Sequence, residues 1–432
     1  MNAPQNASSK AVTADATRAS KVQQVVSKSG IEAWLVEDYA VPLVAMEFAL
    51  EGGSSQDPIG KAGAATMLGG LMDEGAGSLD AEAFHNAMDD KAIEISFSSD
   101  SDAFHGRLKT MTRHVDAAFG LLKLALNEPR FDHDAIERVR AQMAASLRSE
   151  ANDPDAMAAK AWREAAFPHH AYGRPSRGSV ESVPAITRDD LVTMHRAMLQ
   201  RTGLKIAVVG AIDRDRLALM LDEVFSRLPE KGQLVAVPEI EMFGLGQLKI
   251  VDVDVPQATI RFGLPGIALH DPDHIPAMVL NHILGGGVFS ARLFKEVREK
   301  RGLAYSVHSQ LATYRHAATF VGGTSTKNER AAESLSVIEE EIAKLSADGP
   351  TADELDKAQK YLIGSYALRF DTSTKIAGQL VRLQIEGLPV SYMDERNGYV
   401  AGVTLADTHR AARRLFDGKK MLVAVAGRPV GM

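Results

Sequence analysis

An arginine and a tyrosine, seven residues apart, are the side chains of this sequence best suited to binding a polar group. Arg298 and Tyr305 lie in the segment 296–307, Glu-Val-Arg-Glu-Lys-Arg-Gly-Leu-Ala-Tyr-Ser-Val, where a charged helix end runs into a strand. A guanidinium and a phenol can both donate hydrogen bonds to a carbonyl oxygen or to an oxyanion. The same residues also fit a solvated arginine at a helix end and a tyrosine packed in a strand, so the residues alone leave both interpretations open.

The sequence offers little support for a metal site or a nucleophile. There is no cysteine, which excludes disulfides, thiol catalysis and cysteine-ligated metals. His270 and His274 have the spacing of two ligands on a helix, but Pro272 lies between them and predicts a loop. His169 and His170 fall in a turn-rich segment, where we expect surface exposure. No Gly-x-Ser-x-Gly motif is present, so a nucleophile elbow has no support.

Three consecutive glycines precede the arginine–tyrosine segment. Gly285, Gly286 and Gly287 predict a turn between two helices. Such a turn could be a flexible connection, or a place where the backbone of a substrate approaches closely, because glycine has no side chain to block it.

Length and composition indicate a globular protein with more than one domain. The chain has 432 residues, of which 45% are hydrophobic and 24% charged. The net charge of −7 argues against a nucleic-acid partner. No apolar run approaches the ~18 residues needed to span a bilayer. Residues 1–22 are small and polar and lack the pattern of a signal peptide, so we expect a disordered tail and cannot assign a compartment, periplasm or cytoplasm.

An internal repeat defines the expected fold. Thr187 and Thr404 each open a helix that precedes an apolar strand ending in glycine, and they lie 217 residues apart. We therefore expect two homologous domains, residues 23–230 and 248–432, joined by a linker over 231–247. In each copy, two strands, one or two helices, two more strands, several helices and a last strand follow in order. This order predicts an α+β fold, in which each domain is a mainly antiparallel sheet with helices packed on one face.

Longer segments of the sequence resemble the pitrilysin/insulinase-type zinc peptidases, the M16 family, and in particular its bacterial and mitochondrial-processing-peptidase branch (M16B). The resemblance rests on residues 279–307 of the second copy and on residues 51–63, 131–138 and 172–175 of the first. It covers nearly everything after residue 22 and implies the LuxS/MPP-like metallohydrolase fold.

The resemblance also shows what this chain lacks. Active members of the family carry an inverted zinc motif, His-x-x-Glu-His, which here falls on residues 66–70. Thr66 and Gly70 replace the two histidines, and Gly69 replaces the glutamate that activates water. The third ligand of the family would fall near Ala145 or Ser146, and neither is acidic. We therefore expect no metal and no cofactor in this chain.

The arginine–tyrosine pair, by contrast, matches the family. The resemblance implies that Arg298 holds a carbonyl of the substrate backbone and that Tyr305 hydrogen-bonds the oxyanion formed during hydrolysis. Together these features suggest the non-zinc subunit of a heterodimeric metallopeptidase, inactive alone, whose zinc lies on an M16B-type partner subunit and whose substrate is an unfolded peptide. The alternative is a catalytically inert scaffold, like the core proteins of the respiratory bc1 complex.

Overall fold

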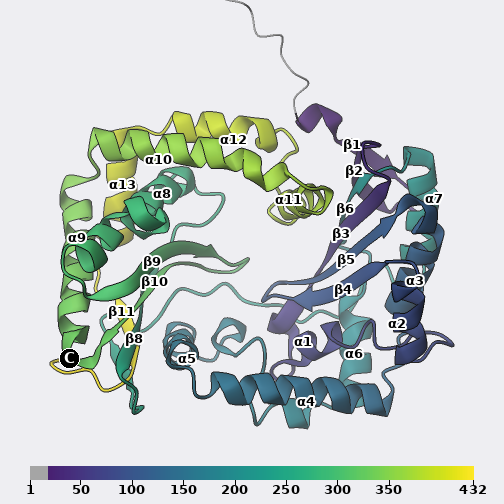
Figure 1. Ribbon diagram of the computed structural model, residues 1–432, viewed down its shortest axis with the longest axis horizontal. Helices are drawn as coiled ribbons and strands as arrows, with labels where there is room; N and C mark the ends of the chain where they lie inside the picture. Colours follow the sequence, from purple (N-terminus) through teal and green to yellow (C-terminus); the bar gives the residue numbers. More distant parts are fainter. Residues whose placement is uncertain (1–17) are drawn as a thin grey trace, which may run out of the picture.

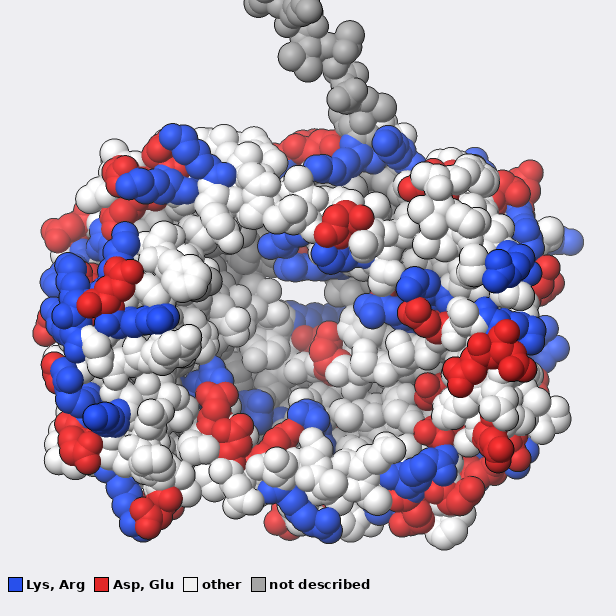
Figure 2. Space-filling model, in the orientation of Figure 1, with Lys and Arg blue, Asp and Glu red and all other residues white. Residues whose placement is uncertain are grey.

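The computed structural model describes residues 18–432, which form two halves around a central opening (Figures 1 and 2). The first half contains, in chain order, β1 (Gln23–Val26), β2 (Glu32–Glu37), β3 (Leu43–Glu51), α1 (Ala64–Gly69), α2 (Ala81–Asp89), β4 (Glu94–Ser99), β5 (Ala103–Met111), α3 (Val115–Asn127), α4 (His133–Glu150), α5 (Pro154–Ala166), α6 (Arg188–Met198), β6 (Lys205–Gly210) and α7 (Arg214–Phe225).

The second half begins after residues 231–247, which form neither helix nor strand. It contains β7 (Leu248–Val251), β8 (Gln257–Pro265), α8 (His274–Asn281), the π-helices η6 (His282–Gly286) and η8 (Phe294–Glu299), β9 (Ala304–Thr313), β10 (Ala318–Lys327), α9 (Ala331–Asp348), α10 (Ala352–Gly364), α11 (Ser373–Ile385), α12 (Tyr392–Ala401), α13 (Leu405–Phe416) and β11 (Leu422–Ala426).

Each half is built on one mainly antiparallel sheet. The strand orders are β1-β2-β6-β3-β5-β4 and β7-β11-β8-β10-β9, and only the β2–β6 and β7–β11 pairs within them are parallel. Apart from β1, which the sequence did not predict, the two orders match strand for strand. The predicted fold class, two homologous α+β domains, is confirmed. The exact domain limits stay predictions, and most of the expected tail, residues 1–17, lies outside the described residues.

The repeat extends to single contacts inside the sheets. In the first sheet Phe48 lies opposite Gly106, and in the second Phe262 lies opposite Gly322. A Cβ atom at either glycine would overlap the ring of its partner phenylalanine. Both cores therefore need a glycine at the same place, because the ring crosses the neighbouring strand there.

The two helices from which we inferred the repeat, α6 and α13, also begin in the same way. Thr187 and Asp190 form a capping box at the start of α6, and Thr404 and Asp407 form the same box at the start of α13. In each box the threonine accepts from the backbone of the acid, and the acid accepts from the backbone of the threonine. Each helix then leads into the last strand that its sheet receives.

The two halves exchange one helix each. Helix α5 of the first half packs on β8 and β11 of the second sheet, and α11 of the second half packs on β3 and β6 of the first (Figure 1). Trp162 on α5 donates to the carbonyl of Leu422 at 3.2 Å, and Gln384 on α11 donates to the carbonyl of Ile206 at 2.9 Å. Each sheet is thus covered on both faces, by its own helices and by one from the other copy.

The tip of the β9–β10 hairpin also contacts the first half. The Tyr172 hydroxyl donates to Asp102 Oδ1 at 2.6 Å and accepts from the backbone N–H of His316 at 3.1 Å. Asp102 Oδ2 accepts from the backbone N–H of Arg315 at 2.9 Å, and the rings of Tyr172 and Tyr314 stack at 4.8 Å. These contacts, here named the hairpin latch, join the β4–β5 turn to the second sheet.

Within residues 18–432, no helix combines the length and the apolar character required to cross a bilayer.

Candidate functional site

Arg298 and Tyr305 are brought together by a short turn. Arg298 lies near the end of the π-helix η8, and Tyr305 is the second residue of β9. Gly302, at a φ of 59°, closes the turn by donating its N–H to the Arg298 carbonyl at 2.9 Å. The guanidinium carbon of Arg298 then lies 4.4 Å from the centre of the Tyr305 ring and 4.8 Å from that of Phe294. The sequence analysis missed Phe294, although its spacing of four from Arg298 on a helix was a usable signal.

The polar ends of this pair are free to bind a ligand. Among the described residues, no hydrogen bond involves the Arg298 guanidinium or the Tyr305 hydroxyl, and Tyr305 is 81% exposed. The neighbouring cations are already paired, because Lys300 and Arg301 both bind the carboxylate of Glu296 at 2.6 Å. The stacked rings fix the plane of the Arg298 guanidinium by cation–π attraction and leave its N–H groups available.

The three glycines do not form the predicted turn. The chain continues from α8 into the π-helix η6, so that Gly285 and Gly286 are helical and Gly287 follows the helix end. A Cβ atom on Gly285 would lie 2.7 Å from the backbone nitrogen of Ser309 on β9. The missing side chain therefore lets the helix pack directly on the strand. A contact of this segment with a substrate stays a prediction.

The positions of the absent zinc motif form part of a packed helix. Thr66 on α1 donates its hydroxyl to the carbonyl of Ser176 at 2.9 Å. Gly69 is buried against β4, where a Cβ atom would lie 3.4 Å from Ser98 Cα. A Cβ atom on Gly70 would lie 3.3 Å from a methyl group of Val139, on α4. None of the three residues Thr66, Gly69 and Gly70 carries an imidazole or a carboxylate.

A cation lies beside the place expected for the third ligand. Arg177 donates to the hydroxyl of Ser146 at 3.0 Å and pairs with the carboxylate of Glu150, one turn further along α4. Ala145 is exposed and offers only a methyl group. Within the described part of the chain, no three His, Cys, Asp or Glu side chains gather in a group that could hold a metal ion.

His170, which we expected from the sequence to be exposed, is buried. His170 accepts from the backbone N–H of Tyr172 through Nδ1 and binds the carbonyl of Pro238 through Nε2 at 3.0 Å. Both ring nitrogens are thus used in fixing the loop that carries Tyr172. His169 is exposed, as predicted.

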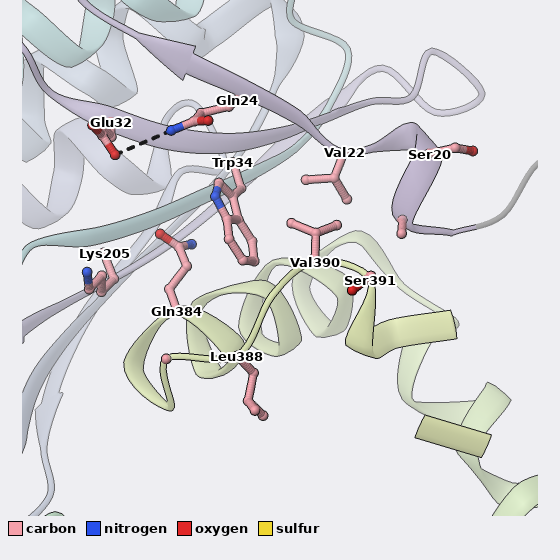
Figure 3. A pocket seen from close by; sticks show the side chains of 12 residues that line it. Ser20, Val22, Gln24, Glu32, Trp34, Lys205, Gln384, Leu388, Val390 and Ser391 are labelled. Atoms are coloured by element: carbon pink, nitrogen blue, oxygen red, sulfur yellow. Dashed lines mark hydrogen bonds between the residues drawn. The ribbon is translucent and has the colours of Figure 1, made fainter. Parts of the chain in front are cut away.

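An open cleft of about 780 Å³ lies away from the arginine–tyrosine pair. It separates β1 and β2 from the segment that joins α11 to α12, and Trp34, Gln384 and Val390 point into it (Figure 3). Neither Arg298 nor Tyr305 lines it, and the cleft is a gap left beside the exchanged helix α11.

Part of the chain matches a known family, and most of it is similar to individual known proteins. Residues 185–362 match the profile described as "Peptidase M16 inactive domain". The chain is 26% identical over 372 residues to the "non-peptidase homolog YmxG" of Helicobacter pylori, and the match covers 85% of each chain. It is 28% identical to an "uncharacterized zinc protease" of Streptomyces coelicolor over 60% of this chain and 58% of that protein.

A solved structure supports the same relationship. The crystal structure of a peptidase M16 inactive domain from Pseudomonas fluorescens superposes with a TM-score of 0.88 at 25% identity, covering 95% of this chain and 98% of that one. A protease from Helicobacter pylori, at 19% identity and a TM-score of 0.85, shares the fold. Together with the missing zinc ligands, these matches show that residues 185–362 contain a peptidase M16 inactive domain, and that the chain resembles proteins described as inactive M16 domains or non-peptidase homologues over most of its length.

Proposed function

We propose that this chain is the non-zinc subunit of a heterodimeric metallopeptidase that hydrolyses unfolded peptides. A partner chain of the same family would hold the zinc ion and the glutamate base, and this chain would contribute Arg298 and Tyr305. The observation that carries the proposal is the contrast between the two sites. The zinc-motif positions are filled by Thr66, Gly69 and Gly70, whereas the guanidinium and the hydroxyl of the pair make no hydrogen bond within the described chain.

The pair is suited to stabilise charge that develops on a carbonyl oxygen. The Tyr305 hydroxyl would donate to the oxyanion, and the Arg298 guanidinium would hold a neighbouring carbonyl of the peptide backbone. Both groups are preorganised by their mutual stacking at 4.4 Å, so little ordering is left for the moment of reaction. A peptide would reach them from the central opening, beside which β9 forms the edge of its sheet (Figure 1).

The direct test is reconstitution with the partner, identified by co-purification from the native source. Tyr305→Phe keeps the ring that stacks on Arg298 and removes the donor, so we expect turnover of an unfolded peptide to fall by about 10²-fold. Tyr399→Phe, on the exposed side of α12, is the matched control and should leave turnover unchanged. Equal activity of the Tyr305→Phe complex and the unmodified complex would reject the assignment.

An inert scaffold is the second candidate, and it is favoured by the Helicobacter pylori relative, which is described as a non-peptidase homolog. A scaffold has no need of hydrogen-bond donors aimed at a peptide carbonyl. If the reconstituted complex assembles normally but hydrolyses no peptide, with or without Tyr305→Phe, the scaffold explains the chain better.

A further inference from the structure

Arg163, on the exchanged helix α5, is a partly buried arginine without a partner. Within the described part of the chain, the arginines whose Nε is buried without a hydrogen bond are Arg163, Arg201 and Arg261. Arg201 still donates through Nη1 to the carbonyl of Ser29, and Arg261 donates through Nη2 to Asp155. The Arg163 guanidinium makes no hydrogen bond and no ion pair with any described residue. Its charge is thus largely removed from water with no bond to offset the cost.

The carboxylates nearest to Arg163 are bound to other cations. Burial lowers the pKa of Arg163, and the neighbouring charges of Glu164 and Glu150 only partly offset this effect. Glu150 pairs with Arg177, and Glu164 lies 4.0 Å from Lys160, one turn back on the same helix. An arginine remains charged at any pH at which the protein is folded. Arg163 therefore offers its positive charge and its donors to a ligand.

A tyrosine with an unused hydroxyl lies beside Arg163. Arg163 is four residues before Phe167, where α5 ends, and the Phe167 ring meets the Tyr314 ring edge to face at 6.0 Å. The Tyr314 ring also stacks on Tyr172 at 4.8 Å, so two aromatic neighbours hold it. Among the described residues, no hydrogen bond involves the Tyr314 hydroxyl. Burial raises the pKa of Tyr314, an effect that the nearby charge of Arg163 opposes, and the hydroxyl remains a donor at neutral pH.

We propose that Arg163 and Tyr314 form a second binding site of this chain, which takes a carboxylate of a peptide. The guanidinium would donate two parallel hydrogen bonds to the two carboxylate oxygens, and the Tyr314 hydroxyl would donate a third. The C-terminus of a peptide and the side chain of an Asp or Glu offer the same group. The inference rests on the proposed function, because it takes a peptide to be the ligand. It adds a preference for peptides that carry negative charge.

The position of the site favours a peptide as the source of the carboxylate. Tyr305 is the second residue of β9 and Tyr314 directly follows its end, so the two arginine–tyrosine pairs lie at opposite ends of one edge strand (Figure 1). A peptide that lies along this strand from Arg298 approaches Arg163 with a later part of its chain. A carboxylate there supplies the acceptor and the negative charge that Arg163 lacks, whereas a basic group would leave the buried charge unpaired.

The test uses the purified full chain without a partner. Three fluorescently labelled unfolded peptides of one sequence are titrated with it. The first ends in a free carboxylate, the second in an amide, and the third is the amide with one internal Gln replaced by Glu. We expect a carboxylate to tighten binding about tenfold over the neutral amide. The first peptide shows this gain if the site takes the C-terminus, and the third shows it if the site takes an acidic side chain.

Three variants relate the gain to the site. Arg163→Met removes the charge and the donors and should abolish the gain. Tyr314→Phe keeps the stacked ring and should reduce the gain to about threefold. Arg196→Met is the matched control, because Arg196 is an exposed arginine of α6 that also makes no hydrogen bond with a described residue. It removes the same charge and should leave the gain unchanged.

Thermal unfolding separates a binding site from a structural role of Arg163. Since the buried charge has no partner in the free chain, Arg163→Met should unfold at the same or a higher temperature when no peptide is present. An arginine that supports the fold would instead lower the unfolding temperature when it is replaced.

Three outcomes would overturn the inference. Equal affinity for all three peptides would show that the chain does not select a carboxylate. A full gain in Arg163→Met would place the selection elsewhere. A lower unfolding temperature of Arg163→Met, together with a full gain in Tyr314→Phe, would make the arginine structural. Because binding is measured without the partner, these failures are distinct from failure of the proposed function, which turns on the activity of Tyr305→Phe in the complex.

Discussion

Arg298 is oriented by aromatic rings, whereas arginines close to it in sequence are held by carboxylates. Arg292 binds Glu354 through two nitrogens at 2.7 Å, and Arg301 binds Glu296. An arginine paired in this way has used its donors, so it ties elements of the fold together. Among the described residues, the Arg298 guanidinium lies over the rings of Phe294 and Tyr305 and makes no hydrogen bond or ion pair. Its environment therefore leaves it available to a ligand, and this distinction cannot be read from the sequence, where all three arginines have acidic residues nearby.

The zinc-motif positions lead to a prediction about metal binding. Thr66→His, Gly69→Glu and Gly70→His together restore the motif but not the third ligand, so we expect no tightly bound zinc in the triple variant or in the unmodified chain. The guanidinium of Arg177, bound to Ser146, adds positive charge where a cation would have to lie. Elemental analysis after extensive dialysis measures the zinc content.

A fourth change tests the placement of the third ligand. Adding Ala145→Glu or Ser146→Glu to the triple variant should increase zinc binding if the ligand position lies on this turn of α4. Stoichiometric zinc in the triple variant alone would show that another residue supplies the third ligand.

Among the helices and strands, the sequence predicted the internal repeat but not which helices pack on each sheet. The sequence analysis expected helices on one face of each sheet, whereas both faces are covered, and the fully apolar β11 and nearly fully buried β6 fit that second cover. The sequence could not show that α5 and α11 provide that cover by crossing to the other copy, because an amphipathic helix does not specify which sheet it packs on. The π-helix through Gly285 was missed for a similar reason. Three glycines predict a turn, and only the contact with Ser309 explains them in a helix.

The start of α10 gives a prediction about pH. Burial raises the pKa of Glu354, but hydrogen bonds from Arg292 and Thr351 outweigh this effect and lower the pKa to about 2. A carboxyl with a lowered pKa stabilises the fold above its unfolded-state pKa, and this contribution is lost as the pH falls through the folded-state pKa. Glu354→Gln retains a residue able to complete the capping box with Thr351 and should lower the free energy of unfolding at pH 7 by about 1–2 kcal/mol, because solvent screens the partly exposed ion pair.

The difference should shrink as the pH falls from about 4.5 toward 2, since Glu354 takes up its proton in the unfolded chain near pH 4.5 but in the folded chain only near pH 2. Urea unfolding of the two proteins across this range measures it. Asp353→Asn, whose partner Lys357 lies on the exposed surface of the same helix, is the control and should change stability little at any pH. A pH-independent difference for Glu354→Gln would show that packing, not charge, is responsible.

At the scale of the whole molecule, the exchanged helices and the hairpin latch join the halves at separate places. α5 lies on the second sheet, α11 lies on the first, and the latch connects the β4–β5 turn with the β9–β10 hairpin (Figure 1). A hinge motion between the halves would have to break all three contacts at once. We therefore expect the chain to move as one body, so that any closing around a peptide would occur between it and the proposed partner.

Removal of the Tyr172 hydroxyl should weaken the hairpin latch. The buried Tyr172 hydroxyl donates to Asp102 and accepts from His316, and burial raises its pKa, so it remains a donor at neutral pH. Tyr172→Phe removes the hydroxyl, so that the Asp102 carboxylate loses a donor and the His316 N–H loses an acceptor inside the contact. We expect a loss of about 1–3 kcal/mol in the free energy of unfolding. Amide hydrogen exchange at Arg315 and His316 should accelerate, because the hairpin tip opens more often.

Tyr39→Phe is the matched control. Its hydroxyl also donates to a carboxylate, that of Glu37 at 3.0 Å, but it is exposed and lies within one half. We expect little change in the free energy of unfolding and no effect on exchange at the hairpin tip. If Tyr172→Phe lowered stability without faster exchange at Arg315 and His316, the hydroxyl would support the first half alone. Rigidity of the chain would then depend on α5 and α11, whose buried contacts between the halves remain intact in that variant.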